Sequence, residues 1–180
     1  MELITAVLAL AAAAGAVLLV GARLVGDRVP AGPAVGSVAV PRRNELTALV
    51  SVGATLGSLY FSEIANFVPC RLCWFQRIAM YPIAVVAVVG VIRRDTGARW
   101  YVVPLAVVGG AVSAYHSMIE LGWLSDSESC ALFGPSCADV WFETFGFMTL
   151  ALMALAGFVF IIVLNTISFP PNDRPPQEIS

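Results

Sequence analysis

The stretch LITAVLALAAAAGAVLLVGA, residues 3–22, contains no charged side chain and is long enough to decide the fold class. At a rise of about 1.5 Å per residue, roughly twenty helical residues cross the bilayer's hydrocarbon core, which is about 30 Å thick. Continuous apolar runs of this length favour helices over the alternating strands of a membrane barrel. Working outward, four further runs follow at residues 46–66, 74–92, 100–119 and 144–165. The sequence predicts an all-α membrane protein, a four-transmembrane-helix bundle with an additional N-terminal transmembrane helix.

The composition of the 180-residue chain also points to a lipid bilayer as its surroundings. Hydrophobic residues make up 59% and charged residues 12%, and the mean hydropathy is +0.86. In soluble domains about a quarter of the residues are charged. Ten basic and twelve acidic residues give a net charge of −2, which leaves no basic surface for nucleic acid. Nucleic acid is therefore excluded as a partner.

Composition divides the chain into four parts. Gly and Pro are frequent between the first two apolar runs, where they disfavour a helix. The short connection 93–99 makes the third and fourth spans antiparallel neighbours. Two pairs of small residues, Gly53 with Gly57 and Gly109 with Gly110, are expected to let helices pack closely. The four parts are an extra N-terminal helix (1–24), a cytoplasmic linker (25–45), a four-span unit (46–167) and a cytoplasmic tail (168–180).

The distribution of Arg predicts the orientation in the membrane. Arg residues gather in the linker, in the 93–99 connection and in the tail, whereas the 120–143 loop carries acids and no Arg. Basic residues near membrane spans stay in the cytoplasm. The N-terminus, the loop around Cys70 and the 120–143 loop are therefore expected outside. We expect a multi-pass protein of the cell (inner or plasma) membrane, with its cysteines on the extracytoplasmic, oxidising side.

A C-x-x-C motif, Cys70 with Cys73, stands at the outer start of the third span. Free backbone N–H groups and the positive end of a helix stabilise a thiolate there, above all at Cys73. Arg77 lies one turn further along the same face, where its guanidinium favours a thiolate or an anionic ring oxygen. The alternative for Arg77 is that it only reaches out to water or lipid headgroups.

A second pair, Cys130 and Cys137, brackets a turn containing Gly134 and Pro135. Taken alone, this pair is as compatible with a static structural disulfide as with a redox role. All four thiols together also match a structural zinc site in outline. Two pairs that can meet transiently suit thiol–disulfide exchange better than a closed zinc site, which would leave Arg77 without a role.

The segment PCRLCWFQRIAMYP, residues 69–82, resembles the signature of the DsbB/BdbC family of quinone-dependent disulfide-generating membrane proteins. Tyr115-His116 and Trp141 with FGFMT at 145–149 are similar to further family segments, and the resemblance covers roughly residues 46–165. Members usually have four spans, so residues 1–45 are an addition.

What the resemblance implies is a four-helix bundle that reoxidises a DsbA-like, thioredoxin-fold thiol oxidase outside the cytoplasm and passes two electrons to a membrane quinone, either menaquinone or ubiquinone. Carried over by position, Cys70 and Cys73 would be the quinone-linked catalytic pair, and Cys130 and Cys137 the pair facing the partner. The residues that would bind the quinone are Cys73, Gln76, Arg77 as the site's cation, and His116.

Several interpretations stay open. His116 can donate to a quinone oxygen, but a contact with Glu120 that only holds the helix end is favoured. The short spacing from Cys130 to Cys137 leaves the reach of their loop towards Cys70 undecided. A vitamin K epoxide reductase homologue also has two Cys pairs, but its C-x-x-C follows the loop pair, whereas here it precedes it. A non-catalytic membrane protein with structural disulfides is the rival from another class.

Overall fold

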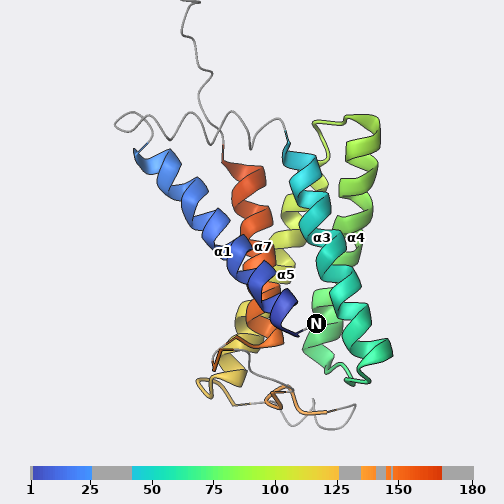
Figure 1. The fold of residues 1–180 in the computed structure, drawn as a ribbon, viewed down its shortest axis with the longest axis vertical. Coiled ribbons are helices and arrows are strands. Elements are labelled where there is room, and N and C mark those ends of the chain that lie inside the picture. Colours follow the sequence, from blue (N-terminus) through green and yellow to red (C-terminus); the bar gives the residue numbers. More distant parts are fainter. Residues whose placement is uncertain (1, 26–41, 126–134, 141–144, 147, 168–180) are drawn as a thin grey trace, which may run out of the picture.

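The computed structural model describes residues 2–25, 42–125, 135–140, 145–146 and 148–167. These residues form five α-helices, and a π-helical turn, η1 (Tyr60–Ile64), extends α3 at its end (Figure 1). The prediction of an all-helical protein is confirmed. The helices are α1 (Glu2–Val25), α3 (Arg43–Leu59), α4 (Arg71–Arg93), α5 (Arg99–Glu120) and α7 (Leu150–Thr166).

Three helices of the described part are long and apolar enough to cross a membrane, namely α1, α4 and α5. The apolar α7 is shorter than these three. Hydropathy predicted a start at residue 144, but the helix begins at Leu150. Thr149 sets this start, since its side-chain oxygen accepts the backbone N–H of Leu152 at 3.3 Å. Helix α3 starts at Arg43, three residues before the expected span. The number of crossings stays a prediction.

Helices α3, α4, α5 and α7 form a ring in which each packs on the next and α7 returns to α3. Their shared core contains Ile83, Val102, Phe158 and Ile161, all fully or almost fully buried. Gly109 of α5 has a packing role, as expected, because a Cβ there would clash with Phe158. The helices of this ring hold the cysteine motif at one end of the bundle.

Helix α1 lies outside the ring and crosses it diagonally (Figure 1), packing on α7. The contact is made by Ala16 and Leu19 of α1 with Phe160 and Leu164 of α7. Gly15 permits the close approach, since a Cβ there would lie 2.9 Å from the Phe160 ring. The opposite face of α1 carries exposed Val and Leu side chains, as a lipid-facing surface requires.

Candidate redox site and adjoining cavity

The C-x-x-C motif forms the first turn of α4. Cys70 is the N-cap residue with extended backbone, and its sulfur accepts the backbone N–H of Cys73 at 3.3 Å. The Cys70 thiol donates to the Cys73 sulfur, with 3.0 Å between the two Sγ atoms. Helix geometry therefore holds the two sulfurs next to each other, as the motif predicted, and only Cys73 retains partial exposure.

Donation to Cys73, followed in size by burial, raises the pKa of the Cys70 thiol from 9.0 to about 12. Burial acts in this direction because Cys70 is only 3% exposed and a charged sulfur there would lose its hydration. In a coupled pair the first proton leaves the site that better holds the charge. That site is Cys73, which lies within the positive N-terminal turn of the helix.

Cys137 lies in the same buried cluster as Cys70, together with Ile119 of α5. Its side chain is fully buried. The loop therefore reaches Cys70 at the position of Cys137. Cys130 lies outside the described residues, so its assignment to the partner-facing pair stays a prediction.

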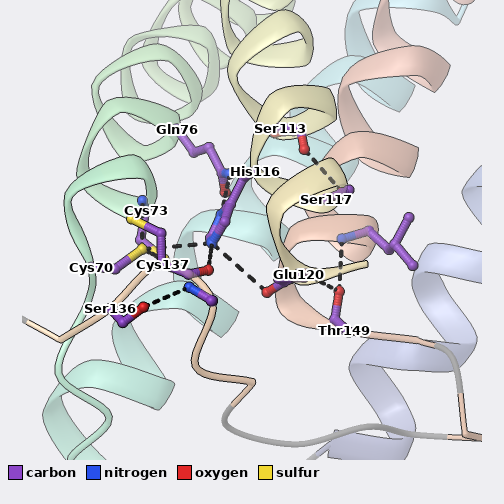
Figure 2. Close-up of polar contacts among 12 residues, drawn as sticks. Cys70, Cys73, Gln76, Ser113, His116, Ser117, Glu120, Ser136, Cys137 and Thr149 are labelled. Carbon is purple, nitrogen blue, oxygen red and sulfur yellow. Dashed lines mark hydrogen bonds and ion pairs between the residues drawn. The ribbon is translucent and has the colours of Figure 1, made fainter. Parts of the chain in front are cut away.

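His116 of α5 connects the C-x-x-C motif to the loop (Figure 2). Its Nε2 lies 3.7 Å from the Cys70 sulfur and 3.2 Å from the backbone oxygen of Cys137. Its Nδ1 lies 3.0 Å from the Gln76 amide nitrogen. The expected contact with Glu120 is present, at 3.8 Å from Nε2. The histidine therefore does more than hold the helix end, because it is buried directly against a motif sulfur.

The carboxylate of Glu120 is tied to the start of α7. Thr149 donates its hydroxyl hydrogen to Glu120 Oε2 at 2.6 Å, while the same hydroxyl caps α7. Sequence reasoning missed Thr149, which stands inside the expected apolar run, although Thr is one of the residues preferred at a helix N-cap. Cys70, His116, Glu120 and Thr149 thus form a continuous series of polar contacts across three elements (Figure 2).

Arg77 points between α4 and α3 and has a protein partner. Its Nε donates to the Ser58 hydroxyl at 2.9 Å, and its Nη2 donates to the Ser58 carbonyl at 3.0 Å. Its guanidinium also lies 5.2 Å from the centre of the Trp74 ring. The interpretation that Arg77 merely reaches for water or headgroups does not describe this geometry.

A cavity of about 510 Å³ opens beside the motif and runs between α1, α3, α4 and α7. Its lining is polar where Cys73, Gln76, Arg77 and Ser58 meet, and otherwise almost wholly apolar. His116 is not part of the lining. The volume falls within the range of about 300–1,000 Å³ typical of small-molecule sites.

The expectation that Gly53 and Gly57 pack helices closely is wrong for Gly53, which has open space where a side chain would be. Both glycines line the cavity, and Gly57 also meets Thr5 of α1. The spacing of small residues indicates a helix face without large side chains. It does not show whether another helix packs against that face or whether the face borders a cavity.

A metal-binding interpretation also has a geometric basis in the described residues. Single ligand atoms of Cys70, Cys73 and His116 all lie within 4.8 Å of one another. Two thiolates and an imidazole are ligands that zinc accepts. The set differs from the four-thiol site considered from the sequence, because His116 belongs to it and the thiol of Cys137 does not.

Comparison of the sequence with known proteins places the chain in a family. The family model "Disulfide bond formation protein DsbB" matches residues 43–168. "Disulfide bond formation protein C" of Bacillus subtilis (strain 168) is 39% identical over 116 residues, which cover 64% of this chain and 83% of the relative. "Probable disulfide formation protein C 1" of Bacillus anthracis is 40% identical over 114 residues, covering 63% and 82%. No solved structure gives a significant match. The chain belongs to the DsbB family of disulfide bond formation proteins.

Proposed function

We propose that this protein is a membrane thiol–disulfide oxidoreductase that reoxidises an extracytoplasmic DsbA-like, thioredoxin-fold thiol oxidase and passes two electrons to a membrane quinone. One observation carries the proposal. The two cysteines of the motif differ in their surroundings, because Cys70 is buried in the cluster with Cys137 of the loop, whereas Cys73 packs against that cluster and also lines the cavity beside Arg77. A pair placed in this way can accept electrons on one side and release them on the other.

The cavity fits a quinone with an isoprenoid tail. A polar ring with two carbonyl oxygens suits the end formed by Cys73, Gln76 and Arg77, and an apolar tail suits the rest of the lining. Arg77 is held by two hydrogen bonds to Ser58, so its charge is fixed in place before a ligand arrives. A quinone bound there would be the oxidant and would accept two electrons and two protons.

In the proposed exchange, electrons pass from the partner to the loop pair, Cys130 and Cys137, and then to the motif pair, Cys70 and Cys73. Reduction of the Cys130–Cys137 disulfide by the partner dithiol yields the partner disulfide and two loop thiols. The Cys137 thiolate then attacks the Cys70 sulfur of the Cys70–Cys73 disulfide, and Cys73 leaves as a thiolate. Attack by Cys130 on Cys137 restores the loop disulfide and releases Cys70. Two electrons have then passed from the loop pair to the motif pair, and every sulfur bond that broke has a counterpart that formed.

His116 is placed to manage the proton of Cys70. A thiolate at Cys70 is unfavourable in its buried position, so it needs a proton when it leaves and a base when the disulfide forms again. The Nε2 atom of His116 is 3.7 Å from the sulfur. With the Gln76 amide turned by half a rotation, the imidazolium donates from Nδ1 to the amide oxygen and from Nε2 to the Cys137 carbonyl, and Nε2 is the atom that exchanges its proton with Cys70. Glu120 stabilises the resulting imidazolium.

The test mixes purified protein, a reduced C-x-x-C oxidase of thioredoxin fold and a quinone without oxygen, and follows quinone absorbance and thiol content together. We expect one quinone to disappear for every two thiols, and no loss of either with Cys73→Ser. Thiol loss without quinone loss would contradict the proposal. Stoichiometric bound zinc with neither loss would support the metal site formed by Cys70, Cys73 and His116 instead.

A further inference from the structure

Helix α1 forms one wall of the cavity, although it lies outside the region that matches the DsbB family. The lining residues come from its first half and are mostly small. They are Thr5, Leu8, Ala9, Ala11 and Ala12. Opposite them, Gly53 and Gly57 of α3 leave the facing surface without side chains. Helix α1 therefore closes one side of an apolar cavity against the ring of helices.

The second half of α1 holds the helix in place. Gly15, Ala16 and Leu19 pack on Phe160 and its neighbours in α7, as described above. The first half approaches α3 at Thr5. A Cβ added to Gly57 of α3 would lie 3.5 Å from the Thr5 methyl group. The second half of the helix thus packs on α7, while the first half, in which Ala6 and Ala9 are also buried, forms one wall of the cavity.

We propose that α1 completes a binding site for the isoprenoid tail of the quinone, and that the small side chains on its inner face determine how much tail the site accepts. This inference rests on the proposed function. The space is continuous with the polar end at Cys73 and Arg77, so a ring bound there would extend its tail along α1. A tail of repeating apolar units matches a lining with almost no polar groups.

The polar end argues for a quinone over a phospholipid as the occupant. Arg77 is the one basic side chain lining the cavity in the described part of the chain, and two of its donors already bind Ser58. A phosphate group is usually held by several charged or backbone donors. A thiol, an amide and one fixed guanidinium suit the weaker demands of carbonyl oxygens.

The matched variants are Ala12→Phe and Ala14→Phe. Ala12 lines the cavity, whereas Ala14 is exposed on the lipid-facing side of the same helix. Thermal unfolding of the oxidised, detergent-purified full chain, which has no electrons to pass to the quinone, is measured with increasing amounts of a tailed quinone, or of the same ring without a tail. Ligand that binds the folded state raises Tm with its concentration. Ala9→Leu provides a second, smaller filling of the cavity if Ala12→Phe unfolds without ligand.

For the wild type and Ala14→Phe we expect the tail to lower the half-saturating quinone concentration at least tenfold, or about 1.4 kcal/mol. In Ala12→Phe or Ala9→Leu this advantage should shrink severalfold, while the tail-less quinone binds as before. Equal effects of both alanine positions, or no tail advantage in the wild type, would overturn the inference.

A redox-inert isoprenoid alcohol separates this inference from the proposed function. Stabilisation of the wild type by the alcohol, weakened by Ala12→Phe and not by Ala14→Phe, would support the tail site even if no quinone were reduced. Quinone reduction with full activity, but no response to the alcohol, would uphold the proposed function and overturn the role of α1. A tightly held phospholipid that is lost in Ala12→Phe would also overturn it, by naming another occupant.

Discussion

Replacing His116 by Gln tests the assignment of the proton of Cys70 to this histidine. Gln can still make hydrogen bonds near Gln76 and the Cys137 carbonyl, but it cannot take up a proton at neutral pH. The change therefore removes acid–base function while it keeps much of the packing. A structural role would instead appear as a lower Tm.

The magnitude follows from the buried sulfur. With a pKa of about 12, Cys70 is a thiolate in only about one molecule in 10⁵ at pH 7. A positioned base typically contributes about 10²–10⁴ to the rate of such a step. We expect His116→Gln to slow oxidation of the reduced motif pair by about this factor. The residual rate should rise about tenfold per pH unit from pH 7 to 9, since the thiolate fraction grows in that proportion below the pKa.

The assay is stopped-flow mixing of pre-reduced protein with a tail-less quinone without oxygen, at several pH values. The wild type should show a shallower pH dependence than the variant, because its base is internal. Glu120→Gln serves as a graded control and should lie between the two, since it removes a carboxylate that stabilises the imidazolium without touching the sulfur. A His116→Gln rate equal to that of the wild type, with the same pH profile, would refute the reasoning.

Three further predictions concern the cation, the loop and the orientation. Arg77→Ala should weaken binding of the quinone ring about tenfold or more, judged by the concentration that gives half the maximal rate, and Arg77→Lys should fall between; unchanged kinetics with a lower Tm would leave Arg77 a structural role only. Cys137→Ser should accumulate a mixed disulfide between Cys130 and the oxidised partner, visible at the summed mass on a non-reducing gel and lost with dithiothreitol, whereas an adduct with Cys130→Ser alone would exchange the two assignments. A membrane-impermeant thiol reagent should label Cys130 or Cys137 in reduced intact cells and a Cys at Thr96 only after lysis, and labelling of that Cys from outside would reverse the orientation.

Hydropathy was sufficient to predict the helices because lipid requires every backbone group in a span to be satisfied within the helix. It was less reliable at the start of α7. There the apolar run begins well before Leu150, and the Thr149 cap, which also binds Glu120, sets the boundary. The hydrogen bonds of Thr149 set the start of α7, and mean hydropathy does not detect such bonds.

The candidate site was predictable where its residues lie on one helix. The spacing of Cys70, Cys73 and Arg77 placed them on the first turns of α4, and His116 stands one turn from Glu120, as expected. Contacts between distant elements were not predictable. Pairing of Arg77 with Ser58 and of His116 with the motif sulfur depends on how α3 and α5 pack against α4, for which a single sequence holds no direct record.

The most direct test of the account is a single turnover without the partner. Fully reduced protein is mixed, without oxygen, with one equivalent of a tail-less quinone, and disulfides are mapped by mass spectrometry after acid quenching and alkylation. We predict that one quinone is reduced per protein and that the new disulfide joins Cys70 to Cys73 before any loop disulfide appears. Reduced protein that leaves the quinone unchanged, or that forms a disulfide elsewhere first, would contradict the central claim that this pair delivers electrons to the quinone.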